Sequence, residues 1–400
     1  MIFKTYKMEE ALESLIDYRG KTPQKSDEGI MTLSAKSVRD GYIDYSQCYY
    51  ISQEEYDRFM VRGFPKIGDV LMTTEAPLGV TARLDRDDVA LAQRLLTLRG
   101  KRGVLDTGYL YYYLRSPLGQ TKLLERQTGT TVTGIKQAEF RKIEIDLPSV
   151  DIQRKVASFL ETIDEKIIAN KKINKNLYEQ LYLSFKQDYL EVCSNHPEWV
   201  SLTLEDLTDK FATGLNPRKN FVLGHGKNYY VTIKNMLNNR IYLNDKCDKV
   251  DDDALEKINK RSDLKPGDLL FSGIGTIGRT YLIDKPATNW NISESVFTIR
   301  PSSSVSSEFL FLLLLSDEMQ GYAISNSSGS VQKGIRMADL KKYRVMCPSS
   351  NYMETLTSRW RPMISLIKQN EDESDFLAVL RDTLLPKLMS GELDISSVVV

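Results

Sequence analysis

The most constraining feature of this 400-residue sequence is a long internal repeat. The segment GTTVTGIKQAEFRKIEIDLPS, which starts at Gly129, aligns without a gap to GSVQKGIRMADLKKYRVMCPS, which starts at Gly329. KIGDVLMTT, from Lys66, likewise matches KPGDLLFSG, from Lys265. Between these motifs the two halves share almost nothing. A repeat this long indicates a duplicated domain, because the units of solenoid proteins are far shorter.

Each half divides into a β-rich part and one long helical pattern. Short apolar runs such as DVLMT, YYVTI, DLLFS, SVFTI and KIEID are separated by Gly and Pro turns, which is typical of strands. The sequence therefore predicts an α+β protein with two α/β domains and two long helices. The expected boundaries are a first domain at 1–149, a first helix at 150–192, a second domain at 193–349, a second helix at 350–392 and a tail at 393–400.

The two long helices carry matching apolar stripes. No Pro or Gly occurs from Asp151 to Leu190, and apolar residues recur with heptad spacing. A helix of about 40 residues is about 60 Å long, too long for the core of one 150-residue domain. We therefore expect the helices to pair as an antiparallel coiled coil related by a pseudo-twofold axis, and we expect Pro362 to disturb the second helix. The alternative is that each helix lies on its own domain. The expected pairing residues are Val156, Leu160, Ile163, Ile167, Asn170 and Leu177 in the first helix, and Leu356, Trp360, Met363, Ile367, Asn370 and Leu377 in the second.

Composition and motifs argue against an enzyme. Lys+Arg and Asp+Glu both number 54, so net charge gives no hint of a partner. With two histidines and no CxxC pair, a zinc site is not expected, and no metal site is predicted. Gly273–Gly278 fits GxGxxG, but the β-like RTYLIDKP follows it, which favours a hairpin turn over a dinucleotide site. No Asn/Asp-Pro-Pro-aromatic tetrapeptide for adenine methylation occurs. No convincing signal peptide and no membrane-spanning run stand out, so a cytoplasmic protein is expected.

Taken together, the motifs resemble those of the specificity subunits of type I restriction–modification enzymes. The residues that carry the resemblance are RGKTP, GDVLMTTEAPLG, ALAQRLLTLRG, GDLLFSGIGTIGR, the segment from Gly129 through VDIQRKVASFLETID, and LRDTLLPKLMSGEL. One departure is that the second helix begins NYMETLTSRWRP and lacks the Ile-Gln pattern of VDIQRKV.

The resemblance implies two target-recognition domains, each of which reads one half of a split DNA sequence. Partners would be double-stranded DNA, two methyltransferase subunits and two motor/nuclease subunits, with no membrane. No cofactor is expected on this chain, and S-adenosylmethionine, ATP and Mg²⁺ are expected on the partner subunits.

DNA contacts are sought among basic and small polar residues on loops. Gly129–Gly134 and Gly329–Gly334 have the glycine spacing of a P-loop, but Ile135 and Ile335 replace its lysine. These loops could still offer N–H groups and a cation to a DNA phosphate, or simply close a hairpin. For every cation, a solvated surface charge is the alternative. The candidates are Arg19, Lys21, Thr22, Arg94, Thr130, Thr131 and Lys136 in the first half, and Arg218, Lys219, Ser330, Lys333 and Arg336 in the second.

Three functional hypotheses follow from the sequence. The first is a DNA-recognition subunit without catalysis, and the second is a protein–protein scaffold that does not touch DNA. The third, a self-sufficient restriction or modification enzyme, is disfavoured by the missing catalytic motifs. Matched turns carry Glu75 and Pro77 in one half but Ile274 and Thr276 in the other, so a DNA target would be bipartite and non-palindromic.

Overall fold

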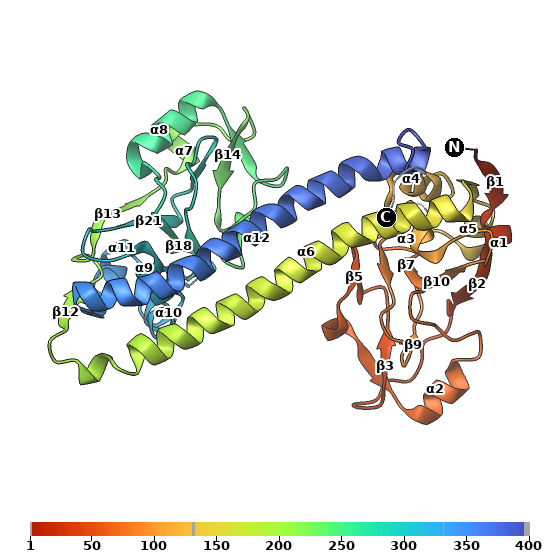
Figure 1. Cartoon of the computed structure of the whole chain (residues 1–400), viewed down its shortest axis with the longest axis horizontal. Coiled ribbons are helices and arrows are strands. Elements are labelled where there is room, and N and C mark those ends of the chain that lie inside the picture. The colour runs from red at the N-terminus through yellow and green to blue at the C-terminus, as the bar shows by residue number, and fades with distance from the viewer. Residues whose placement is uncertain (1, 130–132, 331, 396–400) are drawn as a thin grey trace. The chain divides into compact units, whose positions relative to one another are not determined.

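The chain folds into two compact units built on the same plan. The computed structural model describes residues 2–129, 133–330 and 332–395. The first unit comprises Met1–Ala169 with Glu373–Val400, and the second comprises Asn170–Asp372. Figure 1 labels many of their elements. The two boundaries between the units fall inside the two long helices, so each unit contains part of each long helix.

A four-stranded antiparallel sheet forms the centre of each unit. In the first, the strand order is β2-β10-β7-β8, and in the second it is β13-β21-β18-β19. The registers also match, since Val70 lies opposite Leu98 in one sheet and Leu269 opposite Ile299 in the other. The strands are β2 (Leu12–Asp17), β7 (Val70–Thr73), β8 (Thr81–Arg83) and β10 (Leu95–Gly100), and β13 (Thr208–Thr213), β18 (Leu269–Ser272), β19 (Thr280–Leu282) and β21 (Val296–Pro301).

Shorter strands surround each central sheet in a repeated order. The first unit adds a β1-β11 pair, a three-stranded β6-β3-β9 sheet and a β4-β5 hairpin, and the second adds β12-β22, β17-β14-β20 and β15-β16. Their bounds are β1 (Lys4–Lys7), β3 (Ile30–Leu33), β4 (Val38–Arg39), β5 (Tyr42–Ile43), β6 (Tyr49–Ile51), β9 (Ala90–Leu91) and β11 (Glu144–Leu147), then β12 (Val200–Thr203), β14 (Asn228–Val231), β15 (Met236–Leu237), β16 (Arg240–Ile241), β17 (Asp248–Val250), β20 (Trp290–Ile292) and β22 (Arg344–Cys347).

Helices complete the two units at matching places. Ser116 and Ser316 accept hydrogen bonds from the first turns of α4 and α10, so the same kind of cap starts a helix in both halves. The aromatic run Tyr109–Tyr113 is buried, as expected for core residues. The bounds are α1 (Met8–Ala11), α2 (Gln53–Phe59), α3 (Thr107–Arg115), α4 (Pro117–Glu125) and α5 (Gln137–Arg141), and α7 (Pro217–Asn220), α8 (Asp252–Ser262), α9 (Ser307–Leu315), α10 (Asp317–Ser325) and α11 (Met337–Leu340).

The Gly-Asp pair that the halves share fixes the start of a central strand. Asp69 accepts two hydrogen bonds of 2.7 Å from the Arg99 guanidinium, and Asp268 accepts two of 2.8 Å from Arg300. Each carboxylate is almost fully buried and also accepts a backbone N–H, from Lys66 or Lys265. The hydrogen bonds and charge of Asp69 raise the pKa of Arg99 further, so the guanidinium stays charged. The shared Gly-Asp pair therefore has a structural role, because its carboxylate fixes the start of a central strand.

Two long helices run through both units and pair with each other. They are α6 (Val150–Phe185) and α12 (Ser350–Ser390). In the first unit Asp164 accepts a 2.6 Å hydrogen bond from Arg381, and in the second unit Ser184 accepts one of 2.8 Å from Trp360. Residues later in α6 therefore contact residues earlier in α12. This order confirms the antiparallel pairing (Figure 1).

Asparagines occupy the middle of this helix pair. Asn370 donates a 2.8 Å hydrogen bond to the side-chain oxygen of Asn174, which in turn donates one of 3.0 Å to the carbonyl of Ile367. The side chain of Asn170 is directed at the carbonyl of Asn370, at 3.4 Å. These polar contacts favour one register over slipped alternatives.

The residues expected to pair the helices lie in a continuous stripe, and they also pack on the domains. Nine of the twelve are buried, and Leu177, Met363 and Leu377 are half-buried. Val156 and Leu160 share the first unit's core with Leu388, whereas Trp360 shares the second unit's core with Phe185. The two expected alternatives, pairing of the helices and packing of a helix on a domain, therefore both occur. Each helix end packs on a domain and also on the other helix.

The expected disturbance at Pro362 is wrong, because α12 continues through it as one helix. Pro362 itself is exposed, while Trp360 and Ile364 on the same turns are buried. The cost of the missing N–H is offset by the burial of the opposite face of the helix.

Candidate nucleic-acid interface

Loops from distant parts of the sequence meet at one end of the first unit's central sheet. They are the segment after β2, the turn between β7 and β8, the residues before β10, and the hairpin that precedes α5. Thr74 is the common point, because its N–H donates to the carbonyl of Arg94 at 3.0 Å and its carbonyl accepts the N–H of Ile135 at 2.9 Å. The backbone therefore holds these loops together.

Two arginine candidates of the first unit are bound to this loop framework. Arg19 donates a 2.7 Å hydrogen bond to the carbonyl of Ile135, and it thereby links the segment after β2 to the hairpin. Arg94 forms a 2.8 Å ion pair with Glu75 and has a left-handed backbone, with φ of +70°. A non-glycine residue in that region is uncommon and is held there by its surroundings.

The described ends of the two glycine-repeat loops pair as the ends of hairpins do, which is one of the two expected alternatives. Thr128 and Gly134 exchange backbone hydrogen bonds of 2.7 and 3.0 Å, and Ser328 and Gly334 exchange two of 2.9 Å. A Cβ at Gly134 would lie 2.7 Å from the carbonyl oxygen of Thr74, so only glycine permits this close approach. Phosphate binding by these loops stays a prediction. Thr130 and Thr131 lie outside the described residues.

The second unit assembles its loops by equivalent bonds. The N–H of Ile335 donates to the carbonyl of Gly273 at 2.8 Å, and the N–H of Gly273 donates to the carbonyl of Ser295 at 2.9 Å. The GxGxxG segment lies in the turn between β18 and β19, so the expected hairpin is confirmed. The N–H of Gly275 also donates to the carbonyl of Lys333 at 2.8 Å. The structure thus brings Lys333 to this turn, whereas in the first unit the residue bonded to Thr74 is Ile135, the neighbour of Lys136.

A different polar contact holds the basic helix α7 in the second unit. Asn216 caps α7, which carries Arg218 and Lys219, and donates a 2.8 Å hydrogen bond to Glu294. Tyr230 donates to the other oxygen of Glu294 at 2.9 Å. Burial, followed by the charge of Glu294, raises the pKa of Tyr230, so its hydroxyl remains a donor.

The candidate cations fall into two groups. Arg336 pairs with Asp339 at 2.8 Å, and Arg19 and Arg94 have the partners described above. Within residues 2–129, 133–330 and 332–395, the other five are exposed and have no ion-pair partner. These free cations are Lys21, Lys136, Arg218, Lys219 and Lys333. Thr22 and Ser330 are exposed as well. The free cations therefore stay candidates for phosphate contacts.

Gln120 and Gln320 are positioning residues that sequence reasoning missed. Gln120 donates hydrogen bonds to the carbonyls of Gly79 and Leu114, at 2.9 and 2.6 Å. Gln320 donates to those of Gly278 and Leu314, at 3.0 and 2.5 Å. Each amide holds the end of the turn between two central strands. The two glutamines are separated by 200 residues, which is also the offset of the long repeat. This match could have indicated that they have the same role.

Gln153 explains why the two long helices begin differently. It is fully buried, donates to the carbonyls of Val104 and Pro148 at 2.9 Å, and accepts the N–H of Asp106 at 2.8 Å. The equivalent residue of α12, Met353, packs in an apolar core instead. The second helix thus departs from the Ile-Gln pattern because apolar packing of Met353 replaces the hydrogen bonds that Gln153 makes in the first helix.

Replacement of Gln120 by alanine is expected to affect one half of the molecule only. The Gly79 and Leu114 carbonyls lose their donor, which costs about 1–3 kcal/mol. We expect a lower melting temperature and weaker binding by the first unit's loops, with the second unit unaffected. Gln320→Ala is the matched variant, and it should affect the second unit's loops and leave those of the first unit unchanged. Thermal unfolding and DNA selection on both variants check this, and equal effects on both half-sites would contradict it.

The fold defines a class of proteins built from two similar units, each with a central antiparallel sheet, and two long paired helices. The family model for the type I restriction modification DNA specificity domain matches the chain twice, at residues 11–179 and 197–356. The chain therefore belongs to this family, and the resemblance stated from the sequence motifs is confirmed. It is of the specificity-subunit type and is not itself a catalytic subunit.

Similar proteins agree over most of the chain. The type I restriction enzyme MjaIX specificity subunit of Methanocaldococcus jannaschii is 23% identical over 365 residues, 86% of this chain and 81% of that protein. The MjaVIII specificity subunit of the same organism is 22% identical over 340 residues, 77% and 75% of the two chains. The crystal structure of the S subunit from M. genitalium has the same fold, with a TM-score of 0.62, 16% identity and coverage of 97% and 96%.

Neither membrane-spanning helices nor clusters of metal-binding side chains occur in the described part of the chain. Among the described residues, none of the helices combines the length and the apolar character that a membrane crossing requires. No cluster of three or more His, Cys, Asp or Glu side chains suited to a metal ion occurs in residues 2–129, 133–330 and 332–395.

Proposed function

We propose that this chain reads a bipartite, non-palindromic DNA target for a type I restriction–modification complex. Each unit reads one half-site, and a spacer of unread bases separates the two. The observation that supports this most is that one loop framework is built twice with different side chains. In the first unit Glu75 forms an ion pair with Arg94, whereas the equivalent residues of the second unit are Ile274 and Ser295.

The proposal includes partners that carry the chemistry. Two methyltransferase subunits and, in the nuclease, two motor subunits would bind this chain and hold S-adenosylmethionine, ATP and Mg²⁺. The chain alone would then neither methylate nor cleave DNA. A protein–protein scaffold without DNA binding is the alternative, and the free cations at both loop clusters favour the DNA-binding function.

Selection of bound sequences from random duplex DNA, with the partner subunits present, tests the proposal. We expect two unrelated short half-sites with a fixed spacer. Affinity should also fall with salt, and if all five free cations contact phosphates, the slope of log K against log salt is about −4.5. Lys136→Gln and Lys333→Gln should each reduce that slope by about 1 without changing the preferred sequence. A palindromic or continuous target, or no DNA binding, would refute the proposal.

A further inference from the structure

One segment of the first unit connects the candidate DNA loops with the opposite end of the central sheet. It comprises residues 60–69 and links α2 to β7. Near its start, the N–H of Arg62 donates to the hydroxyl of Tyr18 at 2.8 Å. The Arg62 guanidinium donates to the carbonyls of Asp17 and Arg19, at 2.9 and 3.1 Å. The start of the segment is therefore fixed beside the residues that follow β2.

These contacts make the start of the segment continuous with the candidate DNA interface. Arg19 itself donates to the carbonyl of Ile135 in the hairpin before α5. The carbonyl of Tyr18 accepts the N–H of Lys21, one of the free cations, at 3.3 Å, and the Tyr18 hydroxyl donates to the carbonyl of Gly63 at 3.0 Å. A side chain exposed beside Gly63 thus lies close to the candidate DNA loops.

Two exposed apolar side chains occupy this position. Val61 is 65% exposed and Phe64 is 60% exposed, although both belong to residue types that are usually buried. The Phe64 ring has a tilted contact with Tyr56, with 6.2 Å between the ring centroids, and most of its surface still faces solvent. Apolar side chains that gather at an exposed place often mark a binding surface. Because Arg62 lies between them in the sequence, this surface combines apolar and cationic groups.

The second unit keeps the anchor of this segment. KPGDLLFSG begins 199 residues after its match KIGDVLMTT, and the same offset makes Arg261 the counterpart of Arg62. Arg261 donates to Oγ1 of Thr213 at 3.0 Å, and Thr213 ends β13 as Asp17 ends β2. Both arginines therefore bind the last residue of equivalent strands.

The apolar side chains, by contrast, are particular to the first unit. At the same offset, Lys260 replaces Val61 and Asp263 replaces Phe64. Lys260 and Asp263 both form ion pairs within the second unit, at 2.9 and 3.3 Å. A structural role accounts for the arginines, but it does not account for the exposed Val61 and Phe64, because the same fold forms with charged residues in their place.

We infer that Phe64, with Val61 beside it, contacts a thymine methyl group in the major groove of the first half-site. The inference rests on the proposed function, because it assigns one contact at the same interface. Among the base edges in the major groove, only thymine presents an apolar group, its C5-methyl, and the other groups are hydrogen-bond donors or acceptors. An exposed ring beside the cation Lys21 therefore has one apolar partner on DNA, while the cation meets phosphates.

Deoxyuridine tests this inference, because it differs from thymidine only by the absence of that methyl group. Each thymine of the selected duplex is replaced singly, and equilibrium binding is measured with the partner subunits present. At one position of the first half-site, the replacement should weaken binding by about fourfold, the loss from one buried methyl group. Phe64→Ala should bind the thymine duplex at least about fourfold more weakly, and it should no longer distinguish thymine from deoxyuridine at that position. In the second half-site, Phe64→Ala should leave the effect of every replacement unchanged.

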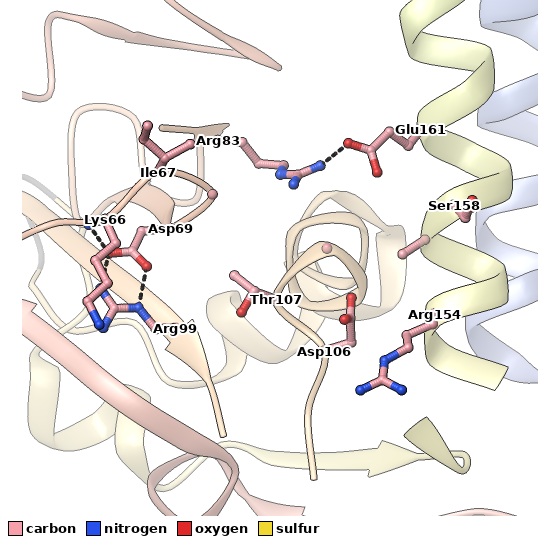
Figure 2. Close-up of a pocket in the computed structure, with 13 residues that line it drawn as sticks. Lys66, Ile67, Asp69, Arg83, Arg99, Asp106, Thr107, Arg154, Ser158 and Glu161 are labelled. Atoms are coloured by element: carbon pink, nitrogen blue, oxygen red, sulfur yellow. Dashed lines mark hydrogen bonds and ion pairs between the residues drawn. The ribbon is translucent and has the colours of Figure 1, made fainter. Parts of the chain in front are cut away.

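Ile67→Ala is the matched control. Ile67 is 65% exposed and belongs to the same segment, but it lies at the other end of the sheet, where it borders a pocket with Asp69 and Arg99 (Figure 2). This variant should bind both duplexes as the unaltered chain does. Melting temperatures of Phe64→Ala and Ile67→Ala should stay near that of the unaltered chain, because both side chains are mostly exposed.

The outcomes separate this inference from the proposed function. A first half-site without A·T pairs, or a methyl preference that persists in Phe64→Ala at every position, overturns the inference and leaves the bipartite target intact. An equal loss by Phe64→Ala on thymine and deoxyuridine duplexes would indicate a ring inserted between bases, and it also overturns the methyl contact. If the unaltered chain with its partners binds no DNA, the proposed function fails, and this inference fails with it.

Discussion

A chain that carries the first recognition domain twice is expected to bind a palindrome built from the first half-site. In this chimera residues 1–149 replace the second domain, and both long helices are kept. Two identical reading units in an antiparallel frame read an inverted repeat, as symmetric dimers do. Each mismatched base pair costs about 1–3 kcal/mol, so with three read base pairs the natural target should bind about 100-fold or more weakly than the palindrome.

The structure shows which residues the junction of this chimera must include. The first domain rests on the start of α6 through Gln153, Val156 and Leu160, whereas the second rests on Met353 and Trp360 of α12. A copy of the first domain placed before α12 would leave the N–H of Asp106 without the Gln153 acceptor. We therefore expect Met353→Gln to stabilise the chimera, because an unpaired buried donor costs about 1–3 kcal/mol.

Selection of bound sequences, with the partner subunits present, measures the outcome. The unaltered chain is the first control, and the chimera that keeps Met353 is the second. Retention of the natural asymmetric target by a folded chimera would show that the domains do not read the half-sites independently. A folded chimera without any preferred sequence would equally contradict the proposal.

The sequence predicted the framework well because the repeat marks residues with structural roles. The Gly-Asp pairs at Asp69 and Asp268 recur since each carboxylate binds an arginine on the neighbouring strand. The runs DVLMT and DLLFS recur because they form the fully buried strands β7 and β18. Matching residues at a fixed offset therefore indicated both the strands and the packing of the duplicated fold.

The contacts among the candidate DNA residues could not be predicted in the same way. Arg19 contacts the carbonyl of Ile135, 116 residues away, and no local pattern indicates a bond between two irregular loops. The pair of Arg94 with Glu75 depends on the turn geometry, and its counterparts in the second half are not charged. Residues that differ between the halves carry no repeat signal, although they are the ones on which different targets would depend.

The long helices illustrate how packing can outweigh local propensity. Proline normally breaks a helix interior, yet α12 continues through Pro362 because Trp360 and Ile364 are buried on its other face. The heptad pattern identified the helix pair, but not that its ends also belong to the domain cores. Because Val156 and Trp360 each pack on a domain, each domain is attached to the long helices through a hydrophobic core.

Insertion of four residues into the long helices is expected to lengthen the spacer while both half-sites stay unchanged. Four helical residues add about 6 Å, the rise of one or two base pairs of DNA. The insertion has to be made in both helices, between Ala169 and Asn170 in α6 and between Asp372 and Glu373 in α12. These points are the divisions between the units, so each unit keeps its own helix contacts.

Insertion into one helix only is the informative control. It would shift α6 against α12 and would separate either the pair of Asp164 with Arg381 or that of Asn174 with Asn370. We therefore expect the single insertions to lower the melting temperature, and the matched insertion to keep it and to select a spacer longer by one or two base pairs. An unchanged spacer in the stable, matched variant would show that the helices do not set the distance between half-sites.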